Sequence, residues 1–394
     1  LHPVAHSFPT RRSSDLEKTQ TWTRLSVGEF VSEGTMLAVP LCFPGQSVPP
    51  PAEECPIASM ALDPSGATVY LGTAGPRAHV MSAMLRTDTG VVADLGVVPG
   101  ATRVAGLSAD EEHVWAVGSG PNGSALWRWP RMHREFLMQE WTVPRFEPEK
   151  VADLFDESVA DAVAVRGGQG FVGVTDPGGR LFRMALDGSE PKPLGQLDEE
   201  GRFSRRIGLD PCGRIWASRG RGELCCWHPA NGEIVEVGRI PAAAGRGQHT
   251  QASAWAIDPR SGAVYGGTTP DGFIFRIEDG RPPVVVALGK PTRLDDVNCL
   301  AVGHDGRLFG AAGLAEDIGH VFSHDPETGG SRDLGIPVSA LAARQYGYHF
   351  ACMLTGRDGE VYLGQHERGG HLWIYFPPMP NGHAAKSDEL EIPF

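Results

Sequence analysis

The stretch "RDGEVYLGQ", residues 357–365, joins a charged turn to a short strand that carries an aromatic residue between aliphatic neighbours. The same pattern occurs six more times along the chain, at intervals of 44 to 56 residues between the aromatic positions. These positions are Tyr70, Trp115, Phe171, Trp216, Tyr265, Phe309 and Tyr362. A repeat of about this period, built from short strands, is typical of the blades of a β-propeller.

Each repeat can be extended to four strands. An apolar strand such as "ASMALDP" precedes the aromatic one, and a strand such as "HVMSAML" and a short "DLG" or "ALG" strand follow it. The seventh repeat ends near Phe376 without its fourth strand, and we expect "TWTRLSVGEF", from Thr21, to supply it. Such closure removes the open edge of a sheet. The sequence therefore predicts an all-β, seven-bladed β-propeller with four-stranded antiparallel blades, closed by an N-terminal strand.

The chain has 394 residues, and we expect residues 17–376 to form this single propeller and residues 377–394 to form a C-terminal tail. Residues 1–16 are set apart from the fold. They lack an initiator methionine, and "SFPTRRSSDL" resembles a translated sequencing adapter, so this segment is interpreted as a cloning or assembly artefact.

The composition argues against two classes of binding partner, nucleic acid and the membrane. The formal net charge of −13 argues against nucleic acid, which is bound through clustered Lys and Arg. No run of 18 apolar residues is present, which argues against a membrane span. The seven cysteines show no CxxC spacing, and most lie in apolar strand patterns, where reduced cysteine behaves as a small hydrophobe. This pattern favours a cytoplasmic protein, unless an N-terminal signal peptide has been lost.

Antiparallel strands place the longest, most variable connections on one face of the disc, where ligand sites usually lie. Polar residues before or at the start of the innermost strands should ring the mouth of the central channel there. Arg, His and Tyr predominate among the candidates, which are Arg103, Arg205, Arg206, His249, Asn298, Arg344, Tyr346, Tyr348 and His349.

The last repeat adds His366. If Asp358 and Gly359 form a two-residue turn, Ala351 faces His366, and the two imidazoles of His349 and His366 are diagonal neighbours. They could then share a substrate or a divalent metal ion, whereas no other cofactor is indicated. A further three histidines recur at one position of the repeat, which favours a structural role: His79, His320 and His371.

The chain after residue 16 resembles seven-bladed propellers as a whole, and its Arg, His and Tyr candidates are similar to the sites of propeller polysaccharide lyases such as oligogalacturonate and ulvan lyases. The resemblance implies a carbon–oxygen lyase that cleaves an acidic, uronate-containing oligo- or polysaccharide by β-elimination. This chemistry needs a carboxylate clamp, a base and a proton donor.

These roles can be assigned to the candidates. Arg205, with Arg206 or Arg344, would clamp the carboxylate. His349 or His249 would be the base, and Tyr348 the proton donor or the partner of the base. The remaining candidates would bind the substrate: Arg103, Tyr346, Asn298 and His366.

Two other functions fit the sequence. A glycoside hydrolase would need paired carboxylates, which Asp161 with Asp295 or Asp296 could provide across the mouth. A non-catalytic propeller would bind a glycan or a protein through the same loops, for which the connection "IPVSALAARQYGYHF", residues 336–350, is suited.

Overall fold

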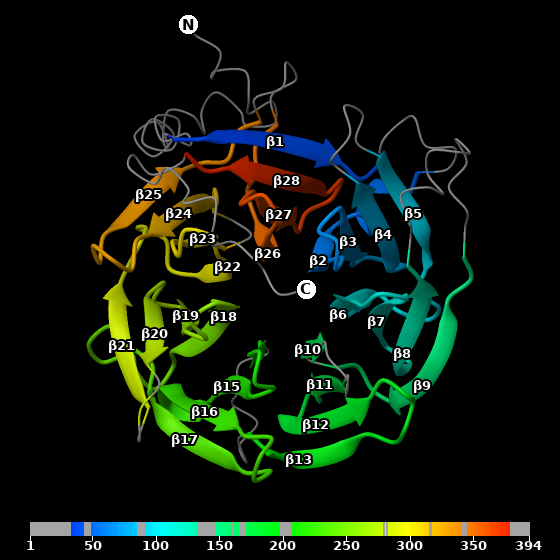
Figure 1. Ribbon diagram of the computed structural model, residues 1–394, viewed down its shortest axis with the longest axis horizontal. Helices are drawn as coiled ribbons and strands as arrows, with labels where there is room; N and C mark the ends of the chain where they lie inside the picture. The colour runs from blue at the N-terminus through cyan, green and yellow to red at the C-terminus, as the bar shows by residue number, and fades with distance from the viewer. Residues whose placement is uncertain are drawn as a thin grey trace, which may run out of the picture.

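The fold is a ring of seven four-stranded antiparallel sheets around a central axis, as the computed structural model shows (Figure 1). The structure describes residues 33–42, 49–84, 91–131, 146–159, 161–164, 171–197, 206–278, 280, 283–314, 317–339 and 345–378. The predicted all-β propeller with seven blades is confirmed. No helix in the described part of the chain is long and apolar enough to cross a membrane.

Within each blade the strands follow one another from the axis outward (Figure 1). Blade 1 has β2 (Ile57–Leu62), β3 (Thr68–Thr73), β4 (His79–Met84) and β5 (Val91–Val97). Blade 2 has β6 (Arg103–Ala109), β7 (His113–Gly120), β8 (Gly123–Pro130) and β9 (Glu149–Phe155). Blade 3 has β10 (Asp161–Ala164), β11 (Phe171–Thr175), β12 (Arg180–Ala185) and β13 (Lys192–Gln196).

Blade 4 contains β14 (Gly208–Leu209), β15 (Ile215–Arg219), β16 (Glu223–Trp227) and β17 (Ile234–Arg239). Blade 5 contains β18 (Gln251–Ile257), β19 (Val264–Thr269), β20 (Ile274–Glu278) and β21 (Val284–Gly289). Blade 6 contains β22 (Val297–Val302), β23 (Leu308–Ala312), β24 (His320–His324) and β25 (Ser331–Gly335). Blade 7 contains β26 (Phe350–Thr355), β27 (Val361–Gln365) and β28 (His371–Phe376).

An N-terminal strand completes blade 7, as predicted, but it is not the segment that the sequence suggested. Strand β1 (Thr35–Pro40) pairs antiparallel with β28, from Thr35 opposite Phe376 to Pro40 opposite His371. The predicted segment from Thr21 lies outside the described residues. The edge of blade 7 is therefore occupied by "TMLAVP", whose alternating Met36 and Ala38 are buried against the blade.

The repeated aromatic residues pack in the blades and between them. Tyr70, Trp216 and Phe309 are at most 1 % exposed. Such buried aromatic side chains fill the space between neighbouring sheets and exclude water from it. All seven cysteines are free thiols.

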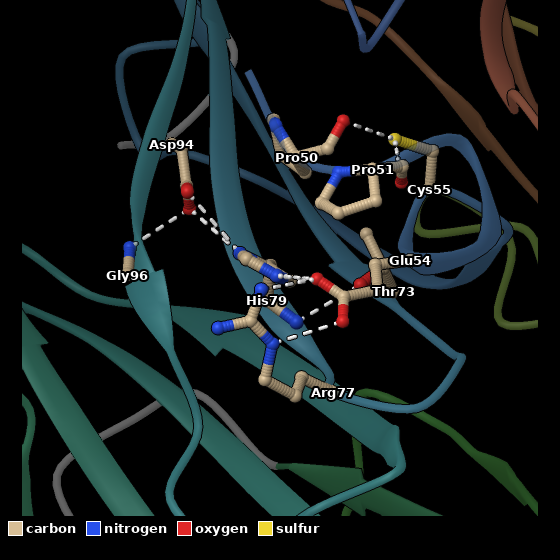
Figure 2. Close-up of polar contacts among 9 residues, drawn as sticks. All are labelled: Pro50, Pro51, Glu54, Cys55, Thr73, Arg77, His79, Asp94 and Gly96. Atoms are coloured by element: carbon tan, nitrogen blue, oxygen red, sulfur yellow. Dashed lines mark hydrogen bonds and ion pairs between the residues drawn. The ribbon is translucent and has the colours of Figure 1, made fainter. Parts of the chain in front are cut away.

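The segment that links the closing strand to blade 1 contains a short 3-10 helix, η2 (Ala52–Glu54). A polar cluster in which Glu54 and His79 are buried ties this helix to the blade (Figure 2). Glu54 accepts hydrogen bonds from Arg77 at 2.9 Å and contacts Nε2 of His79 at 3.0 Å. On its other side, Nδ1 of His79 lies 3.1 Å from Asp94 of the outermost strand.

The structural role predicted for the recurring histidines is supported by their contacts. His320 repeats the arrangement in blade 6, with Nδ1 2.9 Å from Asp333. Asp94 and Asp333 both begin a "DLG" sequence, so the repeat encodes a histidine–aspartate pair between its two outer strands. Nδ1 of His371 instead lies 3.1 Å from the side-chain oxygen of Gln365.

Most of the inner strands share an irregularity near their start. A β-bulge interrupts the pairing of the first two strands in blades 1, 2, 5, 6 and 7, each time after the first one or two residues of the inner strand. The bulged residues are Ala58, Ala105, Ser253, Asn298 and Ala351, and all of them line the central cavity. Bulges re-aim side chains, so this repeated feature shapes the channel wall.

Candidate functional site

The inner strands of all seven blades surround a central cavity of about 430 Å³. Polar side chains gather where these strands begin: Asp161, Arg206, Ser253 and Asn298 line the cavity there, with Ser59 of blade 1. We call this end of the cavity the rim. A concave site with a few convergent polar groups is the usual form of a small-molecule site.

Arg206 spans the rim. It precedes β14 in blade 4, and Nη2 donates a 3.2 Å hydrogen bond to the carbonyl of Ala351 in blade 7, on the opposite side of the ring (Figure 1). Its Nη1 lies 3.8 Å from Asp161 in blade 3. The backbone at Arg206 is also held, because the indole nitrogen of Trp255 donates to its carbonyl at 3.2 Å. The guanidinium is therefore fixed over the cavity.

Asp161 is a buried carboxylate, 3 % exposed, and accepts a 2.9 Å hydrogen bond from the backbone of Ile207. Burial raises the pKa of Asp161, although Arg206 and Arg103 oppose the shift by stabilising the charged form. This carboxylate joins the start of blade 3 to the start of blade 4 and helps to position Arg206.

The two imidazoles of blade 7 meet next to the start of β26, near enough to Arg206 to feel its charge, although neither lines the cavity, and their register is not the predicted one. Their ring centroids are 5.8 Å apart with the planes tilted by 70°, and the backbone N–H of His366 donates to the carbonyl of His349 at 2.9 Å. His349 therefore faces His366 directly, and the prediction that Ala351 faces His366 is wrong.

Two local features account for this difference. The hairpin has a three-residue loop, closed by the Gly356 N–H to the Glu360 carbonyl, with Gly359 at φ +90°. The bulge between Phe350 and Cys352 then moves the pairing by one more residue. The correct register brings the two histidines closer together than a diagonal pair would be.

His366 is oriented for a defined role. Its Nδ1 lies 2.9 Å from the carbonyl of Ile57, so in the neutral ring Nδ1 carries the proton and Nε2 carries the lone pair. Burial lowers the pKa of His366, and the nearby positive charges of Arg103 and Arg206 lower it further. Nε2 is therefore available as a proton acceptor near neutral pH.

Burial likewise lowers the pKa of His349, and Arg206 adds to the effect. Both rings are half-buried and are favoured in the neutral form. The positive charge of Arg206 thus lowers the pKa of both histidines, and that of Arg103 lowers the pKa of His366.

Tyr348 precedes this pair and is half-buried. Burial raises the pKa of Tyr348, followed by the charge of Glu367 and the neighbouring Tyr346, so its hydroxyl stays protonated at neutral pH. Tyr346 forms an isolated β-bridge with Val338.

Glu367 is a residue that the sequence reasoning missed. Burial raises the pKa of Glu367, and its carboxylate accepts a 2.8 Å hydrogen bond from Gln365. Its position directly after His366, in a connection that faces the rim, was the available signal. Ser59 and Ser253 were also missed, because small residues in an apolar strand pattern give no sign that they face a channel.

The remaining candidates are more widely placed. Arg103 begins β6 beside the rim, and Asn298 lines the cavity while donating to the carbonyl of Gly313. His249 lies on an exposed turn, with its backbone N–H on the Arg246 carbonyl, and is outside the cavity wall. Arg205 and Arg344 lie outside the described residues.

The carboxylates considered for hydrolysis are not gathered in the cavity. Asp161 lines it, whereas Asp295 is exposed and paired with Lys290 at 2.6 Å, and Asp296 is buried as the acceptor of the Thr269 hydroxyl. Among the described residues, no three His, Cys, Asp or Glu side chains are grouped as a metal site requires.

Comparison with known proteins gives structural neighbours only. The chain matches no protein-family model and no curated protein sequence. Virginiamycin B lyase from Staphylococcus aureus superposes with a TM-score of 0.61 at 12% identity, over 87% of this chain and 100% of that one. The likeness is one of fold.

Two further solved structures are similar to this chain in fold. A catalytically inactive histidine-to-alanine variant of virginiamycin B lyase from Staphylococcus aureus, with quinupristin, has a TM-score of 0.59 at 12% identity over 87% of this chain and 100% of that one. The extracellular domain of a protein described as a one-component system from B. thetaiotaomicron gives 0.57 at 13% identity, over 86% of this chain and 40% of that one.

Proposed function

We propose that this protein is a lyase that cleaves uronate-containing oligo- or polysaccharides by β-elimination at the rim of the central cavity. The observation that carries the proposal is the combination of a neutral, oriented imidazole with a fixed guanidinium. Nδ1 of His366 faces the Ile57 carbonyl, which leaves Nε2 as the proton acceptor, and Arg206 spans the cavity near enough to lower the pKa of His366. A base and a cation in one half-buried site are what proton abstraction next to a carboxylate needs.

The reaction can be followed atom by atom. Arg206, assisted by Arg103, would hold the uronate carboxylate and stabilise the negative charge that develops on it. Nε2 of His366 would take the proton from the adjacent carbon, with His349 beside it as second imidazole. The electron pair of the C–H bond becomes the new carbon–carbon double bond, and the bond to the departing sugar oxygen breaks with its pair.

The departing oxygen needs a proton, and Tyr348 is suited to supply it. Burial keeps its hydroxyl protonated, and the histidine that took the substrate proton can return it to the phenolate. No water molecule is consumed, which distinguishes elimination from hydrolysis.

The fold comparison gives independent, weaker support. Two of the neighbouring structures are of a lyase, and one of those is a variant described as catalytically inactive after a histidine was replaced by alanine. Since identity is only 12%, that likeness supports lyase chemistry on this fold and says nothing about the substrate.

The test is a panel of uronate-containing glycans, followed by the ultraviolet absorbance of the new conjugated double bond, with and without chelator. We expect one class of glycan to react, and His366→Ala to lower the rate about 10²–10⁴-fold. His304→Ala is the control, because His304 is exposed on a turn at the opposite ends of the inner strands.

A folded protein that reacts with no member of the panel would overturn the proposal. Binding without turnover would instead identify a non-catalytic, glycan-binding propeller.

A further inference from the structure

Below the rim, the cavity wall changes from polar to apolar. Each of the seven inner strands contributes an apolar side chain at this level, and β18 adds Ile257 further along the strand. Blades 1 to 4 contribute Met60, Leu107, Val163 and Leu209. Blades 5 to 7 contribute Trp255, Leu300 and Met353. We call these seven residues the apolar collar.

The strand period explains why the collar is complete. In the five bulged strands the collar residue lies two positions after the bulged residue, as Met353 does after Ala351 and Leu300 after Asn298. Side chains two apart on a strand share a face and lie about 7 Å apart along it. In blade 3, Val163 follows Asp161 in the same way.

The residues above the collar leave it accessible from the rim. Three of the five bulged residues are alanines, Ala58, Ala105 and Ala351, and a fourth is Ser253. Small side chains in this row keep the passage from the rim to the collar open. In blade 4, Gly208 makes room for the Trp255 ring of the next blade, because a Cβ there would come within 2.8 Å of the ring.

The collar presents apolar surface that the fold does not bury. Every collar residue except Leu300 is only partly buried, and each lines the cavity. An engineered apolar cavity of about 150 Å³ is enough to bind benzene, so a cavity of about 430 Å³ has room for an aromatic ring beneath a sugar-sized group. Apolar walls with a few polar groups at the entrance are typical of sites for small amphipathic ligands.

We propose that the cavity binds small carboxylates that carry an apolar substituent, with the carboxylate at Arg206 and an aryl or short acyl group within the apolar collar. The carboxylate half of this inference rests on the proposed function, whereas the apolar half rests on the collar alone. Together with the proposed function, this inference narrows the substrate class of the lyase to uronates that carry an aryl or acyl substituent.

Calorimetric titration with three compounds tests both halves. Phenyl β-D-glucuronide has the carboxylate and the ring, glucuronate has only the carboxylate, and phenyl β-D-glucoside has only the ring. Burial of a phenyl ring should make phenyl glucuronide bind about 10- to 100-fold more tightly than glucuronate.

Changing the collar should remove this gain. The double variant Met60→Gln/Met353→Gln alters two neighbouring blades at partly exposed positions of similar volume, so the fold should be retained. We expect the preference for phenyl glucuronide over glucuronate to fall to about threefold or less, with the affinity for glucuronate unchanged. Val284→Gln is the matched control, since Val284 is 53 % exposed on the outer strand of blade 5 and should change neither affinity.

The outcomes separate the two proposals. Equal binding of phenyl glucuronide and glucuronate, no binding of either, or a preference that survives in the double variant, would overturn the role of the collar. If phenyl glucoside binds as tightly as phenyl glucuronide, the carboxylate site at Arg206 fails while the collar stands.

Discussion

Replacing Glu54 by glutamine tests how the closing segment is held in the ring. Glu54 is 4 % exposed and joins η2 to Arg77 and His79 of blade 1, and through His79 to Asp94 (Figure 2). Glutamine keeps the shape but removes the charge that faces a guanidinium and an imidazole. Glu54 and His79 are buried, but the Arg77 side chain is 58 % exposed and its ion pair is weakened by solvent, so we expect a cost of about 1–3 kcal/mol in the free energy of unfolding.

The loss should depend on pH. The hydrogen bond from Arg77 is the main cause that holds the pKa of Glu54 below 4.5, against burial and with help from His79. Burial alone would lower the pKa of His79, but Asp94 and then Glu54 outweigh it and raise it above 6.5. The Glu54 contribution is present above pH 4.5 and lost as pH falls through its lowered pKa. The His79 contribution is present below pH 6.5 and lost as pH rises through its raised pKa.

The difference between wild type and Glu54→Gln should therefore be largest between about pH 4.5 and 6.5 and should shrink above that range. Denaturant unfolding at a series of pH values measures it. Glu53→Gln is the matched control in the same 3-10 helix, because Glu53 is exposed and lies 3.8 Å from Arg368. If Glu54→Gln costs no more than Glu53→Gln, or if its cost is the same from pH 5 to pH 8, the reasoning is refuted.

Three further predictions concern the rim and blade 7. Because burial lowers the pKa of His349 and His366, the rate of elimination should fall in acid with a midpoint below pH 6.5. A pH–rate profile with a midpoint above that value would contradict a histidine base. Arg206→Gln should lower kcat about 10²–10³-fold, as expected for the loss of a group that stabilises developing charge, and unchanged kcat would remove it from the site. Gly359→Ala should cost about 1 kcal/mol or more in denaturant unfolding, because φ is +90° there, and a neutral result would argue against the three-residue loop.

The architecture could be predicted from the sequence because it is repeated. Seven aromatic strands at a regular period define seven blades, and the "DLG" aspartates anticipate the outer strands that His79 and His320 contact. The closing strand occurs only once, so no sequence repeat identifies it. Thr21 onward and Thr35–Pro40 are both plausible strands by residue type, and only the pairing with β28 distinguishes them.

Only part of the cavity wall could be predicted from the sequence. Arg206 and Asn298, at the starts of inner strands, line the cavity, whereas His249 lies outside it and most of the lining residues carry no polar signal. The opposition of His349 and His366 depends on one glycine in a left-handed conformation and one bulge, and each of these moves the register by a single residue. The span from Arg206 to Ala351 joins blades 4 and 7 across the ring, so no local pattern could indicate it.

The masses of the products formed from a reactive uronate glycan test the central proposal most directly. Elimination at the rim predicts fragments whose masses sum to that of the substrate, one of them unsaturated, and their loss in His366→Ala. Fragments that together exceed the substrate by one water molecule would show hydrolysis and would contradict the account.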